Sequence, residues 1–188
     1  RIISSGKMTA AIAAVVLVDF KNEYAKPGGK LHDAVAEVMR ENEMLQKATQ
    51  IVEEARKSGA LVIHSPSLEN PNITGSRPTY LRRCGLFEAD QWNSKIVDEV
   101  HRIESDIVLN ARTNTSALEG TELRSIVEEN RIQSIILMGF LSDGAIVETA
   151  IALSDYFPDL NVMVCRDATA SERKKHKGAM SKVIVLNV

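Results

Sequence analysis

Short, unbroken apolar runs separated by helical patterns constrain the fold of this chain more than any other feature of its sequence. The runs are rich in aliphatic and β-branched residues and do not alternate between apolar and polar positions. Strands of a parallel sheet have this pattern, because helices bury both of its faces. Five segments fit the description: Ala11–Phe20, Leu61–His64, Ile107–Asn110, Ser134–Phe140 and Asn161–Arg166.

Helical periodicity fills the intervals between these runs. In Leu31–Lys57 apolar residues recur at helical spacing with charged residues opposite, and Gly59 is expected to end this helix. Three further helices are expected at Thr121–Asn130, Asp143–Tyr156 and Ser171–Lys182. The alternation predicts an α/β fold with three α/β/α layers, a central, mainly parallel, Rossmann-like sheet and right-handed crossovers.

Length and composition favour a single domain. The chain has 188 residues, 44% hydrophobic and 26% charged, which is enough to bury a sizeable core. We expect one domain over residues 1–188, with residues 1–8 as a candidate disordered or vector-derived start, because Met8 is a candidate initiator. The interval Ser65–Asn93 has no clear period, so it is either a long functional loop or a surface excursion.

Charge and cysteine content exclude several classes of function. The formal net charge of −2 lacks the basic excess of proteins that bind nucleic acid or membrane surfaces. The run Ala10–Val18 is too short to span a bilayer and no secretory signal is recognised, so we expect a cytoplasmic protein. Cys84 and Cys165 form no CxxC pair, which indicates neither a disulfide framework nor a metal site. We expect Cys84 to be an ordinary thiol and Cys165 to be inert core.

Polar residues follow the predicted strands at the carboxyl edge of the sheet, where open α/β sheets bind ligands. Asp19 ends an apolar run, and burial there favours a protonated carboxyl group that carries a proton, although a turn or capping Asp fits equally well. Ser142 is a candidate N-cap, and the free N–H groups after it would hold a carboxylate or an oxyanion. Arg112 is either an exposed loop arginine or a two-pronged partner for a substrate carboxylate.

Other polar and aromatic residues are weaker candidates. Arg83 has the same ambiguity as Arg112. Trp92, the only tryptophan, either packs or forms the wall of a ligand site. His64 and His176 are both expected to be structural.

Four segments together resemble the isochorismatase-like hydrolase superfamily, which includes isochorismatases, nicotinamidases and N-carbamoyl amidohydrolases. The resemblance extends roughly from Ala11 to Met180. It is carried by Val18-Asp19-Phe20-Lys21-Asn22, with Lys21 where the family commonly has Gln, by Arg112–Leu118, by Gly139–Ala150, and by Asp167-Ala168 followed by His176.

Two departures from the family pattern affect the chemistry. In the amidase members the resemblance implies an Asp, Lys and Cys triad, and the matching positions here hold Asp19, Arg112 and Ala145. A methyl group cannot attack a carbonyl carbon. Arginine stays protonated, so it cannot exchange a proton as lysine does. The thiol route is therefore closed.

Isochorismatases of this family work without the cysteine, and the resemblance implies their chemistry here. A protonated Asp19 would donate to the methylene carbon of the vinyl ether, water would add, and the hemiketal would collapse to pyruvate and a dihydroxy-cyclohexadiene carboxylate. This route needs no metal or other cofactor. Arg112 opposes protonation of Asp19, and the carboxylates of the substrate would offset this effect.

We expect a small acidic substrate to lie among a defined set of side chains. The catalytic positions are Asp19, Arg112 and Ala145, and the substrate-binding residues are Phe20, Asn22, Arg83, Trp92, Leu141, Ser142 and Gly144. Two alternatives stay open: a nicotinamidase-like cysteine amidohydrolase with its nucleophile replaced by Ala145, and a non-catalytic binding member of the family. The resemblance also implies a homodimer or homotetramer.

Overall fold

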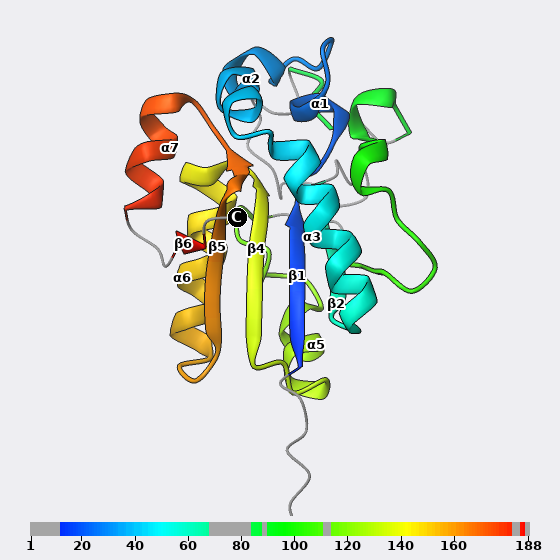
Figure 1. Ribbon diagram of the computed structural model, residues 1–188, viewed down its shortest axis with the longest axis vertical. Helices are drawn as coiled ribbons and strands as arrows, with labels where there is room; N and C mark the ends of the chain where they lie inside the picture. The colour runs from blue at the N-terminus through cyan, green and yellow to red at the C-terminus, as the bar shows by residue number, and fades with distance from the viewer. Residues whose placement is uncertain (1–11, 68–83, 88–89, 111–113, 182–184, 187–188) are drawn as a thin grey trace, which may run out of the picture.

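One parallel sheet organises the part of the chain that the computed structural model describes, residues 12–67, 84–87, 90–110, 114–181 and 185–186. Its strand order is β3-β2-β1-β4-β5-β6, and every pairing between strands is parallel (Figure 1). The predicted parallel α/β fold is confirmed. The strands are β1 (Ala13–Val18), β2 (Leu61–Ser65), β3 (Ile107–Val108), β4 (Ser134–Phe140), β5 (Asn161–Ala170) and β6 (Val185–Leu186).

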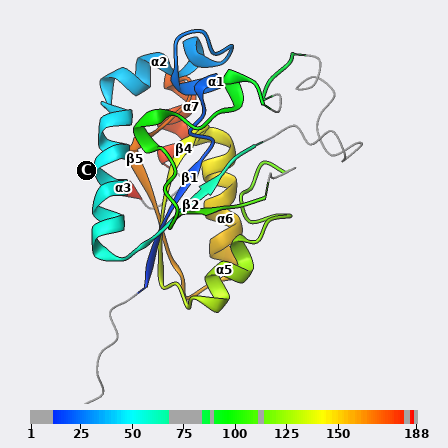
Figure 2. The same ribbon diagram turned by 90° about the vertical axis from the view of Figure 1, so that its right-hand side faces the viewer.

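Helices cover both faces of this sheet. The helices α2 and α3 pack on one face, and α5 and α6 pack on the other, as the side view shows (Figure 2). Strand β1 serves both cores, because Val15 and Leu17 face the first while Val16 and Val18 face the second. The helical elements are α1 (Asn22–Ala25), α2 (His32–Glu41), α3 (Met44–Ser58), η1 (Trp92–Ser94), η2 (Asp98–Val100), α5 (Leu123–Glu129), η3 (Ser142–Ile146), α6 (Val147–Tyr156) and α7 (Arg173–Met180).

The structure corrects several predicted elements. The strand expected over Ile107–Asn110 ends at Val108, and the helix expected from Asp143 begins as η3, with α6 starting at Val147. The single helix expected over Leu31–Lys57 is two helices, because Asn42 ends α2 and Glu43 adopts a left-handed conformation with φ of 52°. The apolar stripe stays in phase across this break, so periodicity alone does not reveal it. Strand β5 continues past Arg166 to Ala170, and β6 was not predicted. Gly59 ends α3 with φ of 79°, as predicted.

The strand order has a switch point between β1 and β4. Chain connections run outward in opposite directions from these two neighbours, and ligands of open α/β sheets bind at the carboxyl ends of such a pair. Val18 at the end of β1 pairs with Gly139 near the end of β4. A Cβ atom on Gly139 would lie 1.9 Å from the carbonyl oxygen of Val18, so only glycine permits this approach.

A buried carboxylate fastens the segment after β1 to a distant loop. The side chain of Glu23 is fully buried, and it accepts hydrogen bonds from the backbone N–H of Lys30 at 2.7 Å, the backbone N–H of Phe87 at 3.4 Å, and the amide of Asn93. These three donors come from sequence positions up to 70 residues away. Glu23 therefore holds α1 against Phe87 and Asn93.

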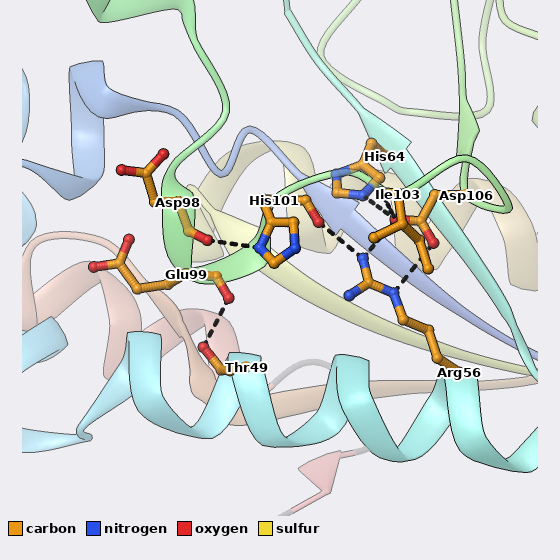
Figure 3. A network of polar contacts seen from close by, with 8 residues as sticks. All are labelled: Thr49, Arg56, His64, Asp98, Glu99, His101, Ile103 and Asp106. Atoms are coloured by element: carbon orange, nitrogen blue, oxygen red, sulfur yellow. Dashed lines mark hydrogen bonds and ion pairs between the residues drawn. The ribbon is translucent and has the colours of Figure 1, made fainter.

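An ion-pair network anchors the end of β2 (Figure 3). Asp106 accepts two hydrogen bonds from the guanidinium of Arg56, at 2.6 and 3.3 Å, and one from the backbone N–H of Ile103. The Nε2 atom of His64 lies 3.3 Å from the same carboxylate. His64 is buried, and its prediction as a structural histidine is confirmed. Burial lowers the pKa of His64, although Asp106 opposes this effect.

Replacing Glu23 by Gln should reduce the free energy of unfolding by about 1–3 kcal/mol, because an amide N–H₂ group would face donors that now meet a carboxylate oxygen. Urea unfolding followed by circular dichroism measures the effect. Glu53→Gln is the matched control, because Glu53 is exposed on α3, and it should change stability by less than about 0.5 kcal/mol. Equal stability of the two variants would contradict the role of Glu23.

Acidification from pH 7.5 to 5.5 should destabilise the protein partly through His64. In the unfolded chain this ring takes up a proton near its ordinary pKa of 6.5, whereas the folded pKa is lower. The unfolded state therefore binds more protons below about pH 6.5, and the free energy of unfolding falls as the pH falls. Urea unfolding at both pH values should show that the free energy of unfolding falls less between pH 7.5 and 5.5 in His64→Gln than in the wild type. The exposed His101 gives the control, since His101→Gln should leave the loss unchanged.

Candidate active site

Asp19 lies at the switch point, directly after β1, and Ser67 contacts both oxygens of its carboxylate. Its side chain is 4% exposed, and its backbone has φ of 53°. The backbone N–H of Ser67 donates to Oδ1 of Asp19 at 2.6 Å, and the Ser67 hydroxyl donates to Oδ2 at 2.9 Å. The backbone N–H of Asp19 donates to the carbonyl of Ser65 at 3.2 Å. The end of β2 thus orients the carboxylate that follows β1.

Lys21 places a buried ammonium group on the other side of Ser67. Its side chain is 1% exposed, and its Nζ donates a hydrogen bond to the backbone carbonyl of Ser67. The same Nζ lies 5.4 Å from the centre of the Phe87 ring, within the range of a cation–π contact. Ser67 therefore contacts a carboxylate through its N–H and hydroxyl and an ammonium through its carbonyl.

The segment after β4 forms a single π-helical turn, η3, that contains Ala145. The peptide bond between Phe140 and Leu141 is cis, and Gly144 has non-helical backbone angles of −125° and −107°. The N–H groups of Gly144 and Ile146 both donate to the Leu141 carbonyl, at 3.1 and 3.2 Å. These two donors are thus already engaged, which corrects the expectation that the turn offers all of its N–H groups to a ligand. Ala145 is 5% exposed.

Ser142 does not cap this turn, contrary to prediction. Its hydroxyl lies 2.8 Å from Nδ1 of His176, and both residues are buried. Burial lowers the pKa of His176, and the nearby Arg166 lowers it further. The neutral ring of His176, which lies on α7, is thereby fixed to the start of η3. His176 therefore has a structural role, as predicted.

The structure separates the other predicted substrate-binding residues. Phe20 packs edge-on against Phe140 in the core, with ring centres 5.6 Å apart. Asn22 donates its amide N–H to the carbonyl of Trp92 at 2.9 Å, so it orients η1. The ring of Trp92 is 48% exposed and borders Gly28. Leu141 is half-buried. Arg83 and Arg112 lie outside the described residues, as do residues 1–8.

Neither cysteine stands near the turn in sequence, and no described cluster suggests a metal ligand set. Cys84 is exposed, whereas Cys165 is buried in the core as predicted, and burial raises the pKa of its thiol. Among the described residues, no group of three or more His, Cys, Asp and Glu side chains could hold a metal ion. In that same part of the chain, no helix has the length and apolar character needed to cross a membrane.

Sequence reasoning missed two residues of this site. Lys21 was recognised only as a departure from a common Gln, although its position two residues after Asp19, beside Phe20, was a signal for burial. Ser67 lies at the start of the long aperiodic interval, and no local pattern in the sequence marks it. Its role depends on the pairing of β1 with β2, which brings residues 19 and 67 together.

Comparisons with known proteins agree with this architecture. The isochorismatase domain model matches residues 13–185. The ureidoacrylate amidohydrolase RutB of Caulobacter segnis is 25% identical over 174 residues, covering 83% of this chain and 71% of that protein.

Solved structures give the same result. An isochorismatase-like hydrolase from Alkaliphilus metalliredigens superposes with a TM-score of 0.78 at 17% identity, covering 94% of this chain and 95% of that one. The N-carbamoylsarcosine amidase from Thermoplasma acidophilum gives a TM-score of 0.75 at 25% identity, covering 94% and 96%. Because the domain match spans nearly the whole chain, the resemblance is confirmed, and the chain belongs to the isochorismatase family of hydrolases.

Proposed function

We propose that this protein is a hydrolase in which Asp19 transfers the proton and water is the nucleophile, with the vinyl ether of isochorismate as substrate. The observation that carries the proposal is the pair of hydrogen bonds between Asp19 and Ser67. The reaction leaves no role for a protein nucleophile, which agrees with the methyl group at Ala145.

The two oxygens of Asp19 have partners of different kinds. Oδ1 accepts from a backbone N–H, which can only donate. Oδ2 is bonded to a hydroxyl, which can donate to a carboxylate and accept from a carboxylic acid after rotation. Asp19 can therefore carry a proton on Oδ2 and release it without losing either hydrogen bond.

Hydrolysis of the vinyl ether would begin with the transfer of this proton to the substrate. Oδ2 of Asp19 protonates the methylene carbon of the vinyl ether, and the electron pair of the double bond forms the new C–H bond. Water adds to the resulting oxocarbenium ion and returns a proton to Asp19. The hemiketal then breaks its C–O bond, giving pyruvate and a dihydroxy-cyclohexadiene carboxylate. General acid catalysis of this kind contributes about 10²- to 10⁴-fold to the rate.

A second candidate is amide hydrolysis with water as the nucleophile. The names of two relatives favour it, a ureidoacrylate amidohydrolase and an N-carbamoylsarcosine amidase. In this candidate the carboxylate of Asp19, oriented by its hydrogen bonds with Ser67, would take a proton from the attacking water. In both candidates the partner is a small-molecule substrate, and a homodimer or homotetramer stays a prediction.

Purified protein should release pyruvate from isochorismate, and Asp19→Asn should reduce kcat/KM by about 10²- to 10⁴-fold. A lactate dehydrogenase-coupled assay measures pyruvate, and an ammonia assay with ureidoacrylate runs in parallel. Pyruvate release at the same slow rate from wild type and Asp19→Asn would contradict the first candidate. Ammonia release that depends on Asp19 would instead select the second.

Iodoacetamide should leave the activity of the wild type unchanged, because the turn position that carries the family thiol holds Ala145. Mass spectrometry of the treated protein establishes that the exposed Cys84 has reacted. Loss of activity in step with alkylation would contradict a water nucleophile and implicate a thiol in the reaction.

Lys21 should act as a positioning residue, since it holds the carbonyl of Ser67, and Ser67 in turn holds the carboxylate of Asp19. Lys21→Met should lower kcat by about tenfold or more, and it should also reduce the free energy of unfolding by about 1–3 kcal/mol, because the buried carbonyl of Ser67 loses its donor. Lys21→Arg keeps the charge and should restore part of the rate. The pH profile of kcat should move in Lys21→Met and not in Lys21→Arg. A purely structural lysine would change stability and leave the pH profile in place.

A further inference from the structure

A pocket of about 380 Å³ lies between α2 and α7, where they meet the end of β5. Figure 1 shows α2 and α7 side by side at the carboxyl edge of the sheet, and the two helices are in contact. The pocket contains none of the residues that hold Asp19. Its polar lining comes from Glu41, Asn42, Arg166, Arg173, His176, Lys177 and Ser181.

A large irregularity in β5 carries Arg166 into this pocket. Leu137 of β4 pairs with Val164, but Gly139 pairs with Thr169, so residues 165–168 of β5 lie opposite Met138 alone. Such a bulge redirects side chains out of the regular ladder. Arg166 is exposed at the pocket, and it forms no ion pair with any described residue.

Some charged side chains around the pocket have ion-pair partners among the described residues, and others do not. Arg173 pairs with Glu37 at 2.8 Å and also with Glu41, and these hydrogen bonds raise its pKa. The only carboxylate in the described lining, Glu41, shares Arg173 with Glu37, so these three side chains together keep one negative charge. Lys177, like Arg166, has no ion-pair partner in the described part of the chain. An uncompensated positive charge remains at the pocket.

One hydrogen-bond donor in the lining also lacks a partner. The Nδ2 atom of Asn42 is buried, and no described group accepts a hydrogen bond from it. An unsatisfied buried donor is unfavourable by about 1–3 kcal/mol, and such groups are rare in folded proteins. Asn42 is half-buried and lines the pocket, so a rotation of its side chain would bring this donor to an oxygen atom of a ligand.

We propose that this pocket binds a phosphate group, free or as a small phosphate monoester. The guanidinium of Arg166 and the ammonium of Lys177 supply charge-assisted hydrogen bonds to its oxygens, and Asn42 supplies a neutral one. Three donors from α2, β5 and α7 suit a tetrahedral oxyanion, which presents oxygens in several directions.

The position of the site suggests what its occupation does. His176 lines the pocket and is joined to Ser142 at the start of η3 by a 2.8 Å hydrogen bond. A phosphate bridging α2, β5 and α7 would hold α7, and with it His176, against the turn that contains Ala145. The bound phosphate would therefore stabilise the turn η3 and would not contact the substrate.

Isothermal titration calorimetry with inorganic phosphate, at an ionic strength held constant with sodium chloride, tests the proposal without any substrate. We expect saturable binding with one phosphate per chain. Arg166→Ala and Lys177→Ala should each weaken it by about tenfold or more, and Asn42→Ala should weaken it by about threefold or more. A second titration with glycerol 3-phosphate distinguishes a monoester, which would bind more tightly than phosphate, from the free ion.

Lys174→Ala is the matched control, because Lys174 is an exposed lysine on the same helix that does not line the pocket. It should leave the affinity unchanged. Thermal unfolding without phosphate checks that all the variants fold. Absence of saturable binding up to about 10 mM phosphate would overturn the proposal. An equal loss of phosphate affinity in Lys174→Ala and Lys177→Ala would also overturn it, because such a result would mean that only the overall charge of the protein affects binding. Failure of the hydrolysis assays would leave this result unaffected.

Discussion

The close approach of Gly139 to Val18 is the constraint on which the site depends. With φ of 126° and no room for a Cβ atom, Gly139 lets the end of β4 lie directly against the end of β1. Asp19 follows one of these strands, and the turn with Ala145 follows the other. Any side chain at position 139 would separate the two strands where the sheet changes direction. The chemistry of the site therefore rests on a contact between two backbones.

The polar groups of the site are fixed mainly from β2. Ser65 accepts from the backbone of Asp19, and Ser67 holds its carboxylate, so the last residues of β2 and the first after it complete the site. The position of this segment depends on His64, which is anchored to Asp106 and, through it, to Arg56 of α3. An ion pair on the other side of the strand end thus helps to orient Asp19. Because His64 is neutral when buried, this support weakens in acid.

The sequence predicted the layers of this protein better than its site. Strand β4 has the predicted bounds, because its residues are continuously apolar and Gly139 does not interrupt the run. The break between α2 and α3 was missed, because Val38 and Leu45 keep one apolar stripe in phase across it. Ser142 was predicted as a cap from local spacing, whereas its partner His176 lies 34 residues away. Lys21 and Ser67 acquire their roles only when β1 and β2 pair, and one sequence contains no local signal of that contact.

In the proposed mechanism Ala145 provides no nucleophile, so Asp19 would transfer the proton, and the protonation state that each reaction needs from Asp19 would then differ between the two candidate substrates. Attack of water on an amide requires an ionised Asp19, whose two oxygens can accept from the N–H and the hydroxyl of Ser67. Protonation of a vinyl ether requires the opposite form. In the proposed ether reaction the two carboxylates of isochorismate would bring negative charge to the site, which favours a protonated neighbour, whereas a neutral amide would not. The charge of the substrate, and not a difference in the protein, would decide in which direction the proton on Oδ2 moves.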